Sequence, residues 1–92
     1  MYAISFDLNT DELVVHYGKS YNNAYRDIAK FLKAYGFERQ QNSVYFGNEH
    51  TNAVETVVAV RQMSMRFNWL KPCVKNIRML RIEDDDDLSV AL

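Results

Sequence analysis

The stretch that decides the fold is the opening one, Met1-Tyr-Ala-Ile-Ser-Phe-Asp7-Leu8. Large apolar residues alternate along it with small or polar ones, which is the period of a β-strand with one buried face. A strand that begins at the first residue has no preceding segment that could cover an exposed sheet edge, so we expect it in the middle of a sheet. Asp7 then places a carboxylate at the end of a central strand. The simpler alternative is that Asp7 only ends the strand and caps the turn that follows.

The composition predicts one small domain with one core. The chain has 92 residues, a length near the lower limit for a domain that folds without disulfides or metal. Of these residues 48% are hydrophobic, which is enough for a globular core. Cys73 is the single cysteine, which excludes an intrachain disulfide framework and a cysteine-based zinc site. No apolar run reaches the length of a membrane span and no signal peptide precedes the first strand, so we expect a cytoplasmic protein.

The net charge of −1 is distributed unevenly along the chain. Five of the 12 acidic residues form the run Glu83-Asp84-Asp85-Asp86-Asp87, so residues 1–82 carry 11 basic and 7 acidic side chains, a surplus of +4. A body of this charge can meet a polyanion, whereas the acidic run would repel one. We expect a single domain over residues 1–83 and an acidic C-terminal tail over residues 84–92.

Two clear helices are expected after the first strand. Ser20 is a good N-cap and Gly36 a good C-terminal stop, which predicts a helix over residues 21–35. Asn52 and Glu55 fit a capping box at the start of the second helix. Its buried stripe is expected to include Val54, Val57, Val58, Arg61 and Met65, or to be the neighbouring one through Met63 and Phe67. Residues 11–17 are a candidate short helix that Gly18 would end.

Strands are expected over residues 37–39, 43–46 and 76–83, the first two joined as a hairpin. The order strand, helix, strand, strand, helix, strand is the ferredoxin-like βαββαβ arrangement of the α+β class. Its four-stranded antiparallel sheet has the first and third strands in the middle and both helices on one face. Ser43, Lys75 and Asn76 should therefore lie near Asp7, together with the turn that contains Gln41.

The other face of this sheet has no helix over it. From strand parity we expect Ser43 and Tyr45 to share this face with Asp7, while Val44 and Phe46 point to the helices. An uncovered sheet face usually finds a partner, most simply a second copy of the same chain. We therefore expect a homodimer through the open face, which would bring two copies of Asp7 towards each other.

A pair of carboxylates supports two kinds of chemistry. Two copies of Asp7 could hold one Mg²⁺, or they could share a proton so that one acts as a general base. On RNA, that base would take the proton of the 2′-hydroxyl whose oxygen attacks the neighbouring phosphate, and Lys75 or Arg78 would stabilise the developing charge. Tyr45 is a candidate for stacking on a base, and Gln41 for a supporting contact.

A family resemblance rests on the opening strand through Leu8 and on residues 23–28, 36–37, 41–45 and 74–83. Taken together, these stretches resemble the virulence-associated protein D (VapD) family, which is similar in fold and dimer to the second CRISPR-associated adaptation protein. The resemblance implies a ferredoxin-like dimer that cleaves single-stranded RNA or messenger RNA, as the toxin of a toxin–antitoxin pair with a small antitoxin protein as its partner. Asp7 and Ser43 match the family's strand-end Asp and third-strand Ser, which implies catalytic roles for both.

The chain departs from this family at two positions near the expected site. Asn42 stands where family members have Gly, and Asn76 stands where they have Asp, which would reduce activity if that Asp takes part in catalysis or metal binding. Two rival functions use the same fold without catalysis. One is a nucleic-acid-binding adaptor, and the other is a structural dimer like the CRISPR adaptation subunit.

Overall fold

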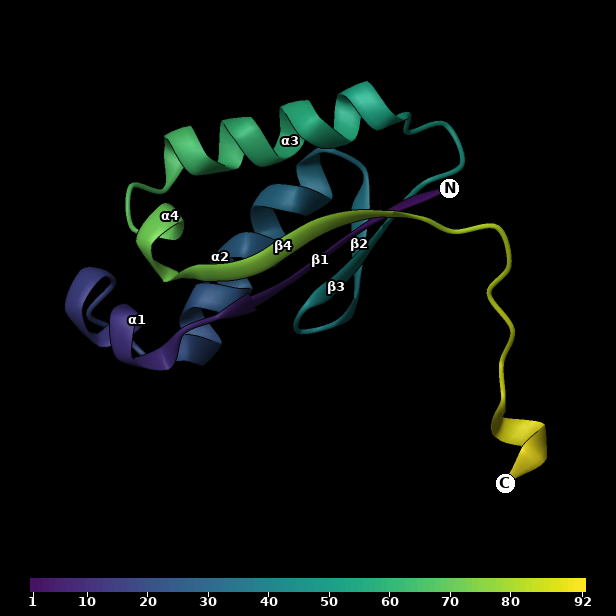
Figure 1. Cartoon of the computed structure of the whole chain (residues 1–92), viewed down its shortest axis with the longest axis horizontal. Helices are drawn as coiled ribbons and strands as arrows, with labels where there is room; N and C mark the ends of the chain where they lie inside the picture. Colours follow the sequence, from purple (N-terminus) through teal and green to yellow (C-terminus); the bar gives the residue numbers. More distant parts are fainter.

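The computed structural model describes residues 1–92, and its centre is a four-stranded antiparallel sheet with strand order β2-β3-β1-β4 (Figure 1). The strands are β1 (Tyr2–Leu8), β2 (Phe37–Gln41), β3 (Val44–Gly47) and β4 (Val74–Arg81). The helices are α1 (Thr10–His16), α2 (Tyr21–Ala34), α3 (Ala53–Arg66) and the short α4 (Leu70–Cys73), with a 3₁₀ turn η1 (Ser89–Ala91) near the C-terminus. This confirms the predicted ferredoxin-like α+β fold, with the opening strand in the middle of the sheet.

The hydrophobic core lies between one face of the sheet and the two long helices. Ile4 of β1 is paired with Tyr45 of β3, so both side chains point to the same face, and both are fully buried. They belong to one cluster with Phe6 and Leu8 of β1, Ala24, Ile28 and Leu32 of α2, and Ala59 and Met63 of α3. Both helices therefore cover the same face, and the opposite face of the sheet is left open.

The helix ends follow the capping signals in the sequence. Asn52 accepts a hydrogen bond from the Glu55 backbone N–H at 2.8 Å, and the Glu55 carboxylate accepts one from the Asn52 backbone N–H at 3.4 Å, so the predicted capping box is present. Ser20 caps α2 through the Asn23 N–H, and Gly36 follows that helix with φ +88°. None of the helices combines the length and the apolar content needed to span a membrane.

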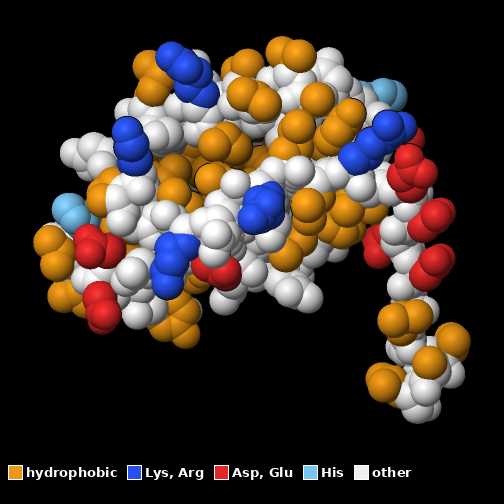
Figure 2. Space-filling view, in the orientation of Figure 1, with side chains coloured by type: hydrophobic (Ala, Val, Ile, Leu, Met, Phe, Trp, Pro, Cys, Tyr) orange, Lys and Arg blue, Asp and Glu red, His pale blue; other side chains and the backbone are white.

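Of the two buried stripes predicted for α3, the one through Val54, Val57 and Val58 is wrong. Val54, Val57 and Val58 are exposed, and the residues that face the core are Thr56, Ala59 and Met63. Thr56 is tolerated there because its hydroxyl donates to the Asn52 carbonyl at 2.9 Å, and Thr56 and Ala59 are small enough for α3 to approach the sheet closely. Figure 2 shows hydrophobic side chains gathered between α3 and β4, where a groove of about 490 Å³ remains between the two elements.

The acidic tail extends away from the domain. The last backbone hydrogen bond to the domain is from the Ile82 N–H to the Met1 carbonyl, at 2.8 Å, and Glu83 forms an ion pair with Arg81 of β4 at 3.6 Å. Beyond it the chain leaves the body, and only η1 is regular (Figure 1). Leu88, Val90 and Leu92 are all exposed.

Candidate active site

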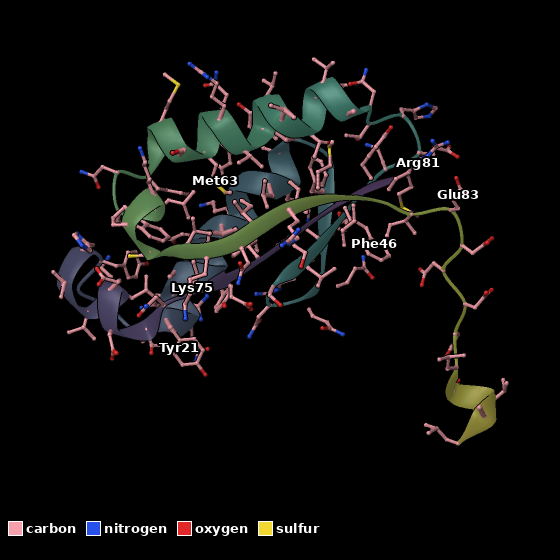
Figure 3. All side chains as sticks on the ribbon, viewed as in Figure 1. Tyr21, Phe46, Met63, Lys75, Arg81 and Glu83 are labelled. Carbon is pink, nitrogen blue, oxygen red and sulfur yellow. The ribbon has the colours of Figure 1, made fainter.

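The open face of the sheet changes in character along β1. At the start of β1, Ala3 is paired with Phe46 on one side and Leu80 on the other, so this end is apolar. At the end of β1, Asp7 is paired with Lys75, so this end is charged. Because directly paired residues of antiparallel strands share a face, Lys75 stands beside Asp7 on the open side. Figure 3 shows Phe46 and Lys75 towards opposite ends of the sheet.

The predicted orientation of β3 is reversed in the structure. Val44 is paired with Ser5, so Val44 and Phe46 lie on the open face, while Tyr45 points to the helices. Tyr45 is 0% exposed and its ring stacks on Phe6 with 5.7 Å between ring centroids. A side chain with no accessible surface cannot stack on an RNA base, so Tyr45 supports the site from the core. The prediction placed β3 one residue out of register with β1, and a shift of one residue moves every side chain of a strand to the other face.

A β-bulge in β4 shapes the charged end of the face. The pairing passes from Asp7–Lys75 to Ser5–Arg78, so Asn76 and Ile77 together stand opposite the single residue Phe6. Asn76 is the only residue other than glycine with a positive φ, at +51°, a conformation that Asn adopts more readily than most residues. Without the bulge, Lys75 and Arg78 would point to opposite faces. With it, both cations share the open face with Asp7.

The structure brings most of the predicted site residues to this end of the sheet. The Ser43 carbonyl accepts a hydrogen bond from the Phe6 N–H at 3.0 Å, which places the start of β3 beside the end of β1. The Ser43 hydroxyl makes no hydrogen bond to Asp7, and no ion pair joins Asp7 to Lys75. Gln41 is paired with Val44 in β2, two strands away from β1, at the same end of the sheet.

Sequence reasoning missed Tyr25, whose hydroxyl lies near Asp7, and Tyr21, which packs on Tyr25. Burial raises the pKa of the Tyr25 hydroxyl, and the nearby negative charge of Asp7 raises it further. The ring of Tyr21 packs edge-on against Tyr25 at 6.1 Å and is 48% exposed, and Figure 3 shows Tyr21 and Lys75 at the same end of the molecule. The available signal was their spacing of four residues at the start of a helix. Tyr21, unlike the buried Tyr45, presents an exposed ring at this end of the molecule.

The donor set of one chain does not fit a metal site. No three His, Cys, Asp or Glu side chains lie close enough together to hold an ion. Asp7 has a lysine as its neighbour across the strands, and a cation in that place opposes metal binding. Any Mg²⁺ at Asp7 would therefore need carboxylates from a second copy.

We expect the domain to lose stability in alkaline solution because of two tyrosines. Burial raises the pKa of Tyr45 from its ordinary 10.0 to about 12, although the nearby positive charge of Arg39 opposes the shift. The geometry of the buried Tyr45 hydroxyl gives it no hydrogen-bond partner. Burial also raises the pKa of Tyr17 to about 12, assisted by its hydrogen bond to Asp27 at 2.6 Å. The folded state holds these protons more tightly than the unfolded state, so stability is constant below the unfolded pKa and falls as the pH rises through about 10 to 12.

Urea unfolding at a series of pH values measures this loss, and Tyr45→Phe is the matched variant. Removal of the unpaired hydroxyl should raise the free energy of unfolding at neutral pH by about 1 kcal/mol, and the alkaline fall should be shallower than in the unmodified protein. Identical pH dependence in the two proteins would contradict the assignment to Tyr45.

Comparison with known proteins gives matches over nearly the whole chain. A family model described as CRISPR associated protein Cas2 matches residues 1–90. Endoribonuclease VapD 2 of Riemerella anatipestifer is 43% identical over 93 residues, which covers 100% of this chain and 99% of that protein. Endoribonuclease VapD of Dichelobacter nodosus is 45% identical over 97% of this chain and 94% of its own length. The Endoribonuclease VapD homolog of Helicobacter pylori is 42% identical over 100% of this chain and 96% of its own length.

Proposed function

Since the chain belongs to the Cas2 family and, within it, groups with the endoribonucleases named VapD, we propose that it is an endoribonuclease that cleaves single-stranded RNA, including messenger RNA. One observation of the structure carries this proposal. Asp7 ends the central strand on the open face, with Lys75 paired across from it and Arg78 turned to the same face by the bulge. A base with two cations on the same face of the sheet provides the groups needed to cleave a phosphodiester bond.

The proposed reaction uses the 2′-hydroxyl of the RNA. The Asp7 carboxylate takes the 2′-proton, the 2′-oxygen forms a bond to phosphorus, and the bond from phosphorus to the 5′-oxygen breaks. The leaving 5′-oxygen takes a proton from solvent. Lys75 and Arg78 donate hydrogen bonds to the phosphate oxygens as negative charge develops on them. In this proposal Ser43, at the start of β3 beside the end of β1, contacts the RNA next to the reacting phosphate. The exposed ring of Tyr21 stacks on an adjacent base.

The proposed assembly is a homodimer through the open face. The apolar pairs around Ala3 give this face a hydrophobic end, and Leu80 there is 41% exposed. A twofold dimer in which these ends pack together would bury that surface. Two copies of Asp7 would then also be available to hold Mg²⁺, as the alternative to proton transfer. The molar mass of the full-length protein in solution tests the dimer.

A cleavage assay with the purified full-length protein tests the proposed activity. We expect a labelled single-stranded RNA to be cut, and a DNA strand of the same sequence to remain intact because it lacks the attacking 2′-hydroxyl. EDTA should leave the rate unchanged if Asp7 acts as a base, and should abolish cleavage if two Asp7 carboxylates hold Mg²⁺. Failure of the folded protein to cut any RNA would contradict the proposal.

The biological role that we propose is that of the toxin in a toxin–antitoxin pair, acting on messenger RNA in the cytoplasm. A small open reading frame for an antitoxin beside the gene, whose product blocks cleavage, would support this role. The match to the Cas2 family model favours a second candidate, a non-catalytic structural dimer that binds nucleic acid. Binding of RNA without any cleavage would support that candidate.

A further inference from the structure

A row of positive side chains runs along the outer side of α2 and onto the edge strand β2. Arg26, Lys30 and Lys33 recur at spacings of four and three residues, so they share one face of the helix. Arg39 of β2 lies beside them, and all four line one hollow of about 430 Å³. We call these four residues the α2–β2 track. Lys30 also lines an adjoining hollow together with Arg66, a fifth positive charge, and the carboxylate of Asp27.

The positive charge of the α2–β2 track is only partly compensated within the chain. None of its four cations takes part in an ion pair, and Glu38 is the one carboxylate in the hollow that they line. Asp27, the only acid of α2, accepts the hydrogen bond of Tyr17 at 2.6 Å and lines the adjoining hollow beside Lys30, so two carboxylates stand against five cations. Like charges three and four residues apart destabilise a helix. A bound anion would relieve this repulsion.

The lining of this hollow favours a polyanion over a protein partner. All four cations are exposed, whereas its one large apolar residue, Phe37, is 1% exposed. The centre of a protein–protein interface is apolar and poor in charge, and this surface has the opposite character. Cations four residues apart on a helix are separated by about 6 Å along its axis, and a row of this kind can follow the backbone of a single strand.

We propose that the α2–β2 track binds the phosphates of single-stranded RNA that flank the cleavage position. Asp7 lies on the open face and the track on the helix side of the sheet, so the RNA would pass round the end of β1. There the charge of Asp7 reaches the hydroxyl of Tyr25 on α2, and Arg26 begins the track one residue further along that helix. An RNA strand cut at Asp7 can therefore continue along α2 towards Lys33. This inference rests on the proposed action on RNA, and it adds a binding surface outside the reacting groups.

Salt-dependent binding tests the track separately from cleavage. The probe is a fluorescent 2′-O-methyl single-stranded RNA of about 16 nucleotides, which lacks the attacking hydroxyl. Its affinity for the full-length protein is measured by anisotropy from about 50 to 200 mM salt. The test variant is Lys30→Gln/Lys33→Gln, and the matched control is Lys19→Gln/Lys71→Gln, which removes the same charge outside the track.

We expect the track variant to lower affinity roughly tenfold, and to reduce the slope of log K against log salt by about 1.4, or about 0.7 per lost contact. The control should retain the slope of the unmodified protein. An unchanged slope in the track variant, or an equal change of slope in the control, would contradict RNA binding by the α2–β2 track. Tighter binding of an acidic protein than of RNA to this surface would also overturn it. RNA cleavage by the unmodified protein, measured in parallel, reports on the proposed function independently.

Discussion

Asp7→Asn is expected to slow RNA cleavage by about 100- to 10,000-fold, the usual contribution of a general base. The amide has nearly the shape of the carboxylate but cannot take the 2′-proton. The fold should be unaffected, because Asp7 is exposed and makes no ion pair. Its backbone pairing with Lys75 does not depend on the side chain. The substitution therefore separates the chemistry of this position from the stability of the strand end.

Initial rates on a labelled single-stranded RNA measure this effect, with the thermal unfolding temperature of each protein determined in parallel. Asp11→Asn is the matched control, since it removes one carboxylate from the exposed first turn of α1, close in sequence to Asp7. The control should retain nearly full activity. Full activity of Asp7→Asn, at unchanged stability, would mean that another group takes the proton and that Asp7 merely ends the strand.

The position of Asp7 beside Lys75 follows from the order of the secondary structure elements. In a ferredoxin-like sheet, β3 and β4 both run antiparallel to β1, so they begin where β1 ends. The convergence of these strand ends depends only on the approximate extent of each strand, so an error of two residues in a boundary does not affect it. The predicted convergence of Ser43, Lys75 and Asn76 near Asp7 was correct for that reason.

The faces of the strands were harder to predict, because they depend on single residues. β3 has only four residues, and a pairing irregularity between Arg39 and Gln41 precedes it. The sequence therefore did not determine which face of the sheet Tyr45 points to, since a shift of one residue reverses the face. The sign of the bulge in the sequence is the pair of consecutive polar residues Lys75 and Asn76, which the start of a strand would also explain. The bulge nevertheless places Lys75 and Arg78 on one face. On α3, valines on several sides made the stripe ambiguous, and the small residues Thr56 and Ala59 determined the close contact.

Phe6→Ala is expected to lower the free energy of unfolding by about 3–5 kcal/mol, the usual cost of removing a buried phenyl ring. Phe6 is 2% exposed and lies between two aromatic rings, with centroid distances of 5.7 Å to Tyr45 and 6.1 Å to Tyr25. Its removal leaves a cavity between β1, β3 and α2. Small domains have about 5–15 kcal/mol of stability in total, so much of it depends on this ring.

Urea unfolding of Phe6→Ala, Phe6→Leu and Ser5→Ala separates the packing of the ring from other changes in β1. Ser5 is on the opposite face of the same strand, so Ser5→Ala should change stability by less than about 0.5 kcal/mol. Phe6→Leu fills part of the cavity and should fall between the other two variants. A loss below about 1 kcal/mol in Phe6→Ala would contradict the packing described here. Because Phe6 precedes Asp7 and its N–H donates to the Ser43 carbonyl, the ring also holds the strand end that carries the proposed base.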